Sequence, residues 1–488
     1  MSGPVDVVVV GSGPNGLAAA VILARAGLDV VVLEGQPTAG GGARTLDLGL
    51  ADGLVHDVCS AVHPMAASSP FFTAFDLPGR GVPFRYPEVS YAHPLPDRPA
   101  GIAYRDLETT VERLEADGPA WQALLGPLVE HAPGIVDVAL GDQRSIPRDV
   151  SGSVRLACAA AEQGTRAWDL RWSTPTAAAL LTGVAAHAIS PLPSLAGAGV
   201  ALVLGALAHR PGWPLPVGGS QAITDALVND LRAHGGRLEL DAPVRTLRDL
   251  PSSRAQVFDT SASGLANIAG DRLPAGYRRA LRRFPFGAGA AKVDFVLSGP
   301  VPWADPEVRR AGTVHLGGTR PDMVAAEAEI AAGRHPEHPM MLVSDPTVVV
   351  PERGSGGLRP LWTYVHVPHG STVDMAAVVQ AEIERYAPGF GDVVVARHST
   401  PAAGMTEHNA NLVGGNLSVG EVSTWRMIAR PTLRWNVHRV PVPGMYLCSS
   451  AAVPGPSVHG MGGWHAARRV LRDVFGIRQR PDLSPGLN

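Results

Sequence analysis

The first 34 residues combine apolar segments with a glycine-rich loop. Residues 5–10 form a near-continuous valine run, which is typical of a parallel strand buried on both faces. The loop GSGPNG, residues 11–16, follows this run and leads into an Ala- and Leu-rich helix over residues 17–26. A second apolar strand over residues 30–33 ends at Glu34. Two parallel strands joined by a helix of this length predict a doubly wound α/β sheet at the start of the chain.

The glycine spacing of this loop is typical of dinucleotide binding. Gly11 permits a tight turn, Gly13 lets the backbone approach a pyrophosphate, and Gly16 allows the helix to pack closely on the strand. The N-terminus of the helix supplies N–H groups and a positive dipole end. Glu34 follows at the spacing of a ribose-binding acid, and its charge disfavours the 2′-phosphate of NADP. The contacts predicted here are Gly11, Gly13, Pro14, Asn15, Gly16 and Glu34.

A second glycine cluster favours FAD over NAD. The run GGGART, residues 40–45, begins six residues after Glu34. Glycines followed by an arginine can wrap along a diphosphate and bring a cation to it, which suits the long groove of a flavin dinucleotide. We therefore expect FAD, held without a covalent link. The contacts predicted from this loop are Gly41, Gly42, Ala43, Arg44 and Thr45.

Charge and cysteine content exclude several classes of protein. The chain has 41 Lys plus Arg against 44 Asp plus Glu, a net charge of -3, which argues against a general binder of nucleic acid or of anionic membranes. Cys59, Cys158 and Cys448 are too far apart for a disulfide framework or a zinc site, so we expect no metal and a reducing cytoplasm. Residues 1–5 lack the basic segment of a signal peptide.

The longest stretch without a charged residue covers residues 172–209. Prolines and glycines interrupt it, whereas a spanning helix needs ~20 consecutive apolar residues. We interpret it as short buried helices. The expectation is a cytoplasmic protein whose membrane contact, if any, is peripheral.

The remaining chain alternates between helical and strand-like segments, which suggests two interleaved domains. The predicted strands cover residues 236–244, 289–297, 312–316, 343–350 and 444–448, and the predicted helices start near residues 220, 323, 375 and 461. We predict a Rossmann-like FAD-binding domain, discontinuous in sequence, with an interleaved α+β substrate domain. The predicted boundaries are residues 1–75, 215–300 and 425–478 for the FAD-binding domain, 76–214 and 301–424 for the substrate domain, and 479–488 for a solvated tail.

Two long segments together resemble one family. The run over residues 11–45 and the closing run over residues 443–463, which contains YLCSS and VHGMGG, are similar to the phytoene desaturase-like FAD oxidoreductases of the flavin amine oxidase superfamily. Within it, the chain is most similar to the pyridine nucleotide-disulfide oxidoreductase domain 2-like branch, and the resemblance covers most of the chain. It departs at residues 454–457, PGPS in place of glycines, and at Asn416, where an acid is common.

The closing motif implies a second contact with the flavin. A helix that starts near His459–Met461 can stabilise the negative charge of a reduced flavin by about 0.3–2 kcal/mol. The resemblance assigns Val244 to the adenine, where a plain buried valine is the alternative. The predicted flavin contacts of the closing motif are Ser450, Val458, His459, Gly460 and Met461.

Lys292 and His459 are the predicted catalytic residues. Lys292 is the only lysine in the chain, which indicates a need for a compact ammonium group. In amine oxidase relatives a lysine on a similarly placed strand holds a water against flavin N5; a lysine that reaches solvent from a strand edge is the alternative. The other candidate acid–base groups, more often packing residues, are His63, His315, His408 and His465.

The predicted function is FAD-dependent dehydrogenation. A hydride and a proton would leave a C–C or C–N bond of a largely apolar small molecule, with dioxygen or another acceptor reoxidising the flavin. Residues 173–208 and 312–318 are expected to line an apolar substrate cavity. One alternative is a flavin amine or amino-acid oxidase with an aromatic cage, for which Trp425, Trp435 and Trp464 are candidates. Two others are a binding protein like the GDP-dissociation inhibitors and an NAD-only dehydrogenase.

Overall fold

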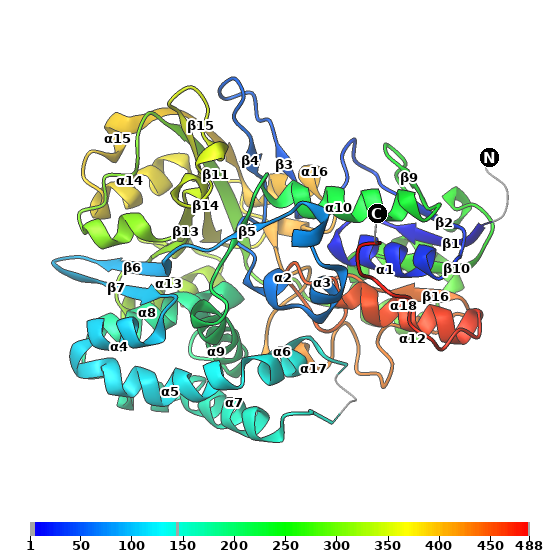
Figure 1. Ribbon diagram of the computed structural model, residues 1–488, viewed down its shortest axis with the longest axis horizontal. Helices are drawn as coiled ribbons and strands as arrows, with labels where there is room; N and C mark the ends of the chain where they lie inside the picture. The colour runs from blue at the N-terminus through cyan, green and yellow to red at the C-terminus, as the bar shows by residue number, and fades with distance from the viewer. Residues whose placement is uncertain (1–4, 143–145, 487–488) are drawn as a thin grey trace.

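Two β-sheets form the centres of the two halves of the molecule (Figure 1). The structure is a computed structural model that describes residues 5–142 and 146–486. The first sheet has five strands in the order β16-β10-β1-β2-β9, and all its pairings are parallel. Its strands are β1 (Val5–Val10), β2 (Val30–Leu33), β9 (Arg237–Glu239), β10 (Ser253–Phe258) and β16 (Met445–Leu447).

The valine run of β1 is buried from both sides. Val7 and Val9 pack with helix α1 (Pro14–Arg25), whereas Val8 and Val10 pack with helix α11 (Ala262–Ala269) on the opposite face. Helices α10 (Ser220–Ala233) and α18 (Met461–Val474) flank α1. This is the doubly wound parallel sheet that the first 34 residues predicted.

The second sheet is mixed and has seven strands. Their order is β15-β11-β14-β13-β12-β6-β7, with β6 and β12 parallel and the other pairs antiparallel. One face packs on α14 (Ala376–Tyr386), and helices α8 (Pro175–Ala185), α9 (Leu195–His209) and α13 (Arg320–Ala331) lie on the other. The strands are β6 (Val89–Leu95), β7 (Arg98–Tyr104), β11 (Gly289–Leu297), β12 (Val314–Leu316), β13 (Met341–Ser344), β14 (Arg359–Val367) and β15 (Val394–Thr400).

A helical layer beneath the second sheet contains the uncharged stretch of residues 172–209 (Figure 1). It folds as α8 and α9, two short buried helices, as predicted. Among the described residues, no single helix is long and apolar enough to cross a bilayer, and one pair of segments, 115–130 and 132–140, reaches that length and composition only across a 73° bend. The layer also contains α4 (Leu107–Arg113), α5 (Gly118–Glu130), α6 (Ala132–Leu140) and α7 (Val150–Gln163).

Short elements connect the two halves. Strand β3 pairs with β4, and β5 pairs with β8. The remaining elements are β3 (Thr45–Leu46), β4 (His56–Asp57), β5 (Phe84–Arg85), β8 (Leu215–Pro216), α2 (Pro64–Ser68), α3 (Pro70–Phe75), α12 (Ala275–Arg282), α15 (Phe390–Val393), α16 (Met405–His408) and α17 (Thr424–Ile428).

The predicted α/β fold is confirmed, with corrections to single elements. Strand β11 lies inside residues 215–300, which were assigned to the FAD-binding domain, yet it pairs in the seven-stranded sheet. A fully buried apolar strand has the same pattern in either sheet, so sequence alone could not assign it. The strand predicted over residues 236–244 is only β9, three residues long. The strand predicted over residues 343–350 ends at Ser344, because the Asp345 side chain accepts from the Thr347 N–H and starts a 3₁₀ turn.

The predicted tail is largely exposed along its described part, and it is also anchored to the rest of the molecule. Leu483 is buried, and its carbonyl accepts a hydrogen bond from Arg80 at 2.9 Å. The Asp482 carbonyl accepts from Arg25 of α1 at 2.7 Å. These partners lie about 400 residues earlier in the chain, so the local sequence of the tail does not reveal them. The last two residues of the predicted tail, 487–488, and the first four of the predicted FAD-binding domain lie outside the described residues.

Candidate cofactor and active site

The GSGPNG loop lies at the carboxyl end of β1 and has the conformation that its glycines allow. Gly11 has a φ of 96°, a value that favours glycine, and its N–H donates to the Leu33 carbonyl at 2.8 Å. A Cβ at Gly16 would lie 2.3 Å from the Gly11 carbonyl oxygen, so this close approach requires glycine. The N-terminus of α1 therefore reaches the edge where parallel sheets of this kind bind ligands.

Glu34 lies beside this loop at the end of β2. Its carboxylate accepts hydrogen bonds from the Ser12 N–H at 2.9 Å and from the Ser12 hydroxyl at 2.6 Å. Its second oxygen accepts from the Gln36 N–H at 3.0 Å. The acid is thus oriented at the place predicted for a ribose.

Asp259 is a further acid at the same edge, which the sequence reasoning missed. It follows β10 and is buried, and its Oδ2 accepts from the Gly16 N–H at 2.9 Å. A Cβ at Gly13 would lie 2.5 Å from the same oxygen. Burial, with the charge of Glu34 adding to it, raises the pKa of Asp259 to about 7. The sequence did contain a signal for Asp259: an acid placed directly after a buried strand lies at the edge where the carboxyl ends of parallel strands meet.

The second glycine loop holds a buried arginine. Arg44 donates from Nε to the Gly41 carbonyl at 3.1 Å and from Nη1 to the Thr38 hydroxyl at 3.2 Å. Its Nη2 donates to His408 Nδ1 at 2.9 Å, which unites two residues predicted separately. Burial lowers the pKa of Arg44. Among the described residues, no carboxylate accepts a hydrogen bond from Arg44, so this cation can serve an anionic ligand.

The closing motif brings the N-terminus of α18 against that of α1. Gly460, with a φ of 67°, precedes α18, and the Gly462 N–H donates to the Asn15 side chain at 3.1 Å. A Cβ at Gly463 would lie 2.0 Å from the Asn15 carbonyl oxygen. The two helix N-termini predicted to face the cofactor are therefore neighbours, although they lie about 450 residues apart.

His459 orders the turn before α18. Its Nε2 donates to the Gly455 carbonyl at 3.1 Å, and its Nδ1 accepts from the Met461 N–H at 3.0 Å. Burial lowers the pKa of His459 to about 4. Both ring nitrogens are occupied, so this geometry favours a contact residue over a proton carrier. Of the other predicted contacts, Val458 is buried, Val244 is half-buried after β9, and the Ser450 carbonyl accepts from Arg430 at 2.6 Å.

Lys292 is a buried residue in the interior of the second sheet. Its strand, β11, lies between β14 and β15, and Lys292 is only 4% exposed, so the alternative of a solvated edge lysine is wrong. The ammonium group forms an ion pair with Asp294 and lies 5.2 Å from the centroid of the Trp362 ring. Burial lowers the pKa of Lys292, opposed by Asp294.

Cys59 lies where the cofactor loop and the second sheet meet. Its Sγ would be 3.6 Å from a Cβ at Gly42, and its carbonyl accepts from the Trp362 indole at 3.1 Å. Burial raises the pKa of Cys59 to about 11, while the charges of Lys292 and Arg44 both act to lower it. The Lys292 side of the sheet therefore faces the second glycine loop.

The remaining candidate histidines are packing residues. His63 Nε2 forms a hydrogen bond with the Ser220 hydroxyl at 2.8 Å, and burial lowers the pKa of His63 to about 4. His465 donates from Nε2 to the Leu140 carbonyl at 3.0 Å. Burial also lowers the pKa of His408 to about 4. Single histidines are more often packing residues than catalytic ones, and the contacts of these three histidines are of the packing kind.

Neutral imidazoles join the two segments expected to line the substrate cavity. His187, before α9, and His315 of β12 have their Nε2 atoms 2.8 Å apart. His93 donates to the Gly318 carbonyl at 2.7 Å. Burial lowers the pKa of His93 to about 4 and that of His187 to about 3. The two segments meet as expected, and their contact is not purely apolar: it contains hydrogen-bonding groups that stay uncharged.

The tryptophans proposed for an aromatic cage do not form one. Trp425 and Trp435 are exposed, and Trp464 packs edge-on against Phe71 with 6.1 Å between ring centroids. A different pair lies beside Lys292, because the rings of Trp362 and Tyr364 are 5.2 Å apart on β14. Neighbouring positions i and i+2 of a strand point to the same face, and that alternation was the available signal.

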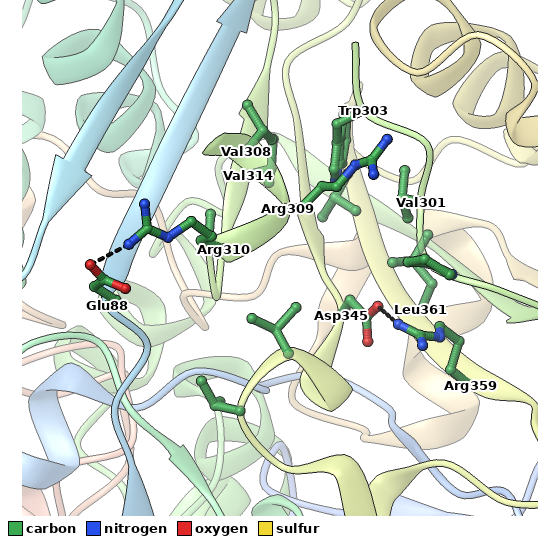
Figure 2. Close-up of a pocket in the computed structure, with 15 residues that line it drawn as sticks. Glu88, Val301, Trp303, Val308, Arg309, Arg310, Val314, Asp345, Arg359 and Leu361 are labelled. Atoms are coloured by element: carbon green, nitrogen blue, oxygen red, sulfur yellow. Dashed lines mark hydrogen bonds and ion pairs between the residues drawn. The ribbon is translucent and has the colours of Figure 1, made fainter. Parts of the chain in front are cut away.

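A surface pocket of about 350 Å³ lies on the other face of the second sheet. Val343 and Leu361 line it, whereas the adjacent Leu342 and Trp362 point to the Lys292 side. Figure 2 shows the ion pairs at its rim, Arg310 with Glu88 and Arg359 with Asp345 at 3.0 Å. The pocket is therefore separate from the cofactor site. Among the described residues, no group of three or more His, Cys, Asp or Glu could hold a metal ion.

Comparison with known proteins agrees with this geometry. Residues 9–76 match the family described as "NAD(P)-binding Rossmann-like domain". The chain is 24% identical over 555 residues to pyridine nucleotide-disulfide oxidoreductase domain-containing protein 2 of Rattus norvegicus, covering 96% of this chain and 94% of that protein. It is also 26% identical over 549 residues to an uncharacterized protein of Mycobacterium tuberculosis, covering 98% of each chain.

Solved structures share the whole fold. Putrescine oxidase bound to putrescine superposes with a TM-score of 0.60 at 18% identity, covering 97% of this chain and 99% of that one. Cyclohexylamine oxidase from Brevibacterium oxydans superposes with a TM-score of 0.57 at 15% identity, covering 96% and 98%. The resemblance read from the two glycine-rich motifs is confirmed: the chain is similar, over nearly its whole length, to the pyridine nucleotide-disulfide oxidoreductase domain-containing proteins 2 and has the α/β, Rossmann-type fold of amine oxidases.

Proposed function

We propose that this chain is an FAD-dependent oxidoreductase of the phytoene desaturase-like type. The observation that carries the proposal is the meeting of the α1 and α18 N-termini through Gly462 and Asn15, with buried Arg44 on the second glycine loop, whose Gly41 lies against Gly13. Two helix N-termini and a cation that forms no hydrogen bond with a carboxylate in the described part of the chain provide positive potential for a dinucleotide. The full-length similarity to an oxidoreductase domain protein supports the same reading.

The residues of the site fit both halves of FAD, the adenosine half and the flavin half. Glu34 would accept from the ribose of the adenosine half, and the backbone of the GSGPNG loop with Arg44 would hold the diphosphate. The N-terminus of α18 would stabilise negative charge at the flavin end. When bound, FAD would supply the hydride acceptor, because amino-acid side chains do not accept a hydride.

Lys292 is the side chain best suited to act at the reacting end. It is buried next to the second glycine loop, and its charge is balanced by Asp294. A compact ammonium there can hold a water or an oxygen atom in a fixed position. The proposed substrate is a largely apolar small molecule that also carries an uncharged hydrogen-bonding group, because the two segments expected to line the cavity contain neutral His187 and His315, and neutral His93 of β6 contacts Gly318.

A flavin amine oxidase is the second candidate. The Trp362 and Tyr364 rings beside Lys292 favour it, since paired aromatic rings suit an amine next to a flavin. Two solved structures with this fold are named as amine oxidases. Oxidation of primary amines by the purified protein, with no reaction of apolar C–H substrates, would favour this candidate over a C–C dehydrogenase.

An absorbance spectrum of the purified protein, before and after acid precipitation, tests the proposal. Flavin bands near one equivalent that pass into the supernatant are expected for non-covalent FAD. Anaerobic bleaching by candidate substrates, followed by recovery on admitting dioxygen, would then define donor and acceptor. A colourless protein that takes up no added FAD would contradict the proposal and favour the binding-protein alternative. The proposed location is the cytoplasm, to be checked by fractionation.

A further inference from the structure

Four large apolar side chains are exposed within eleven residues of sequence. Trp425 and Ile428 on α17 are 54% and 55% exposed, and Leu433 and Trp435 in the following loop are 67% and 78% exposed. We call these four residues the tryptophan patch. Exposed apolar residues are ordinary when single, but a short segment that exposes two tryptophans together with an isoleucine and a leucine is a candidate interaction surface.

Arginines surround the tryptophan patch. The guanidinium of Arg426 lies 5.5 Å from the Phe284 ring, and that of Arg434 lies 5.3 Å from the Tyr277 ring, so the patch adjoins α12. That helix and the residue after it carry four arginines, of which Arg278 is paired with Asp271. The remaining three, Arg279, Arg282 and Arg283, are exposed.

Acidic residues are missing from the sequence around the patch. Between Glu421 and Asp473 the chain contains no Asp or Glu. Of the seven arginines in this stretch, Arg426 and Arg434 lie within the patch segment, whereas Arg430 is buried and Arg439, Arg469 and Arg472 form ion pairs with Asp473 or Asp142. The positive surface beside the patch is therefore formed by Arg426, Arg434 and the three exposed arginines at α12, and the net charge of the whole chain does not reveal it. The net charge of the whole chain argues against binding to anionic membranes. The arginines on this face favour such binding locally.

We propose that the tryptophan patch and its arginines dock on the surface of an anionic lipid bilayer. Tryptophan rings sit well at the membrane–water interface, and leucine and isoleucine side chains enter the acyl boundary. Arginines at the same level are attracted to anionic headgroups. A second copy of this chain is a poor occupant of the patch, because a symmetric contact would bring the same arginines together.

Buried Arg430 connects this surface to the proposed cofactor site. It donates to the Ser450 carbonyl at 2.6 Å and to the Glu421 carbonyl at 2.9 Å, from the middle of the segment that carries the patch. Docking would therefore hold the closing motif near the bilayer, where apolar molecules dissolve. This last consequence rests on the proposed function, whereas docking itself does not require that the protein be an enzyme.

Vesicle flotation tests the proposal with the full chain. Vesicles of phosphatidylcholine with about 30 mol% phosphatidylglycerol should carry the protein, and pure phosphatidylcholine vesicles or about 0.5 M NaCl should release most of it. The variant Trp425→Ser/Trp435→Ser, and separately Arg279→Gln/Arg282→Gln/Arg283→Gln, should each reduce the bound fraction at least about tenfold. Tryptophan emission should shift to shorter wavelength when anionic vesicles are added.

Two matched controls keep the test specific. Leu170→Ser removes an apolar side chain that is 87% exposed elsewhere, and Arg334→Gln removes an exposed arginine that follows α13 beside the second sheet; both should leave flotation unchanged. Equal flotation of the native protein and the patch variants would overturn the proposal, as would failure of the native protein to bind anionic vesicles. A concentration-dependent dimer in sedimentation velocity that the patch variants abolish would assign the surface to self-association instead. Flavin content is measured in parallel, so loss of the proposed function is distinguished from loss of docking.

Discussion

Single residues at the cofactor edge carry charges that the motif pattern did not include. Asp259 accepts from the Gly16 N–H within the dinucleotide loop, next to the place proposed for a diphosphate. An ionised carboxylate there repels phosphate, whereas the protonated acid does not. The acid therefore makes both apoprotein stability and FAD affinity depend on pH.

The substitution Asp259→Asn should remove this pH dependence. The folded-state pKa of Asp259 is raised to about 7 from 3.8, so the acid stays protonated in the folded protein while it ionises in the unfolded chain. Its stability contribution is complete below about pH 4 and is lost as the pH rises through about 7. Relative to the native chain, the variant should gain about 2–3 kcal/mol of unfolding free energy between pH 5 and pH 8. Urea denaturation of the apoprotein at both pH values measures this.

Asp249→Asn is the matched control for that series. Asp249 also accepts hydrogen bonds from backbone N–H groups, those of Thr246 and Arg245 at 2.8 Å, but it lies at the surface and its pKa is lowered, chiefly by the hydrogen bond from Thr246. Its ionisation is complete by pH 5 in both states, so this variant should show the same difference from the native chain at pH 5 and pH 8. A similar pH response in both variants would refute the assignment to Asp259. FAD affinity of Asp259→Asn should also be flat between these pH values, while native affinity falls as pH rises.

The proposed catalytic role of Lys292 can be separated experimentally from its role in folding. Lys292→Met should leave FAD bound but slow flavin reduction or reoxidation by at least about tenfold. The substitution also leaves buried Asp294 without its ion-pair partner, which should lower the free energy of unfolding by about 3–5 kcal/mol. The double variant Lys292→Met/Asp294→Asn should regain most of the lost free energy of unfolding, as measured by urea denaturation. Its rates of flavin reduction and reoxidation, measured by stopped-flow absorbance, should stay as slow as those of the single variant. Unchanged rates in both half-reactions of the single variant would remove Lys292 from the mechanism.

At the level of elements, regular local patterns predicted the nucleotide-binding parts well. Strand β2 and strand β11 have the predicted bounds, and α18 starts at the predicted residue. The strand predicted over residues 343–350 ends early because Pro346 and the hydrogen bond to the Asp345 side chain start a 3₁₀ turn, although valines follow. Apolar composition alone does not distinguish a strand from a buried turn.

The contact between α1 and α18 should be intolerant of a single methyl group. In Gly463→Ala the new Cβ would lie 2.0 Å from the Asn15 carbonyl oxygen, which forces the two helices apart. We expect a loss of about 1–3 kcal/mol in unfolding free energy together with weaker FAD binding. Gly199→Ala on α9 meets no atom within 4 Å and should instead raise stability by about 0.5–1 kcal/mol. Thermal unfolding with and without FAD measures both, and equal effects would contradict the close-packing argument.

At the scale of the whole molecule, the proposed cofactor site is assembled from distant segments. The dinucleotide loop, the second glycine loop with Arg44, and the closing motif near Gly462 come from both ends of the chain, while Lys292 comes from the other sheet. The boundaries predicted for the two domains stay a prediction, apart from the reassignment of β11 to the second sheet.

FAD should therefore stabilise the molecule as a whole. A ligand that binds only the folded state at about 100 times its Kd contributes about 2.7 kcal/mol. Thermal unfolding should show a single transition that moves to higher temperature with added FAD, and Arg44→Met should require a higher FAD concentration for the same shift. If only part of the transition moved, the two sheets would be unfolding independently.

The sequence alone determined the βαβ start, the glycine loop with Glu34, the closing motif and the buried nature of residues 172–209, because each depends on spacing within one short segment. Only the tertiary structure decided that Asp259 lies under Gly13, that Lys292 and Arg44 both face Cys59, that Arg25 and Arg80 hold the end of the chain, and that exposed tryptophans adjoin the arginines of α12. These neighbours are brought together by strand order and helix packing across up to about 450 residues. A contact between residues so far apart in sequence leaves no periodic pattern in either segment. The local sequence of each segment is compatible with its own helix or strand whether or not the partner is present.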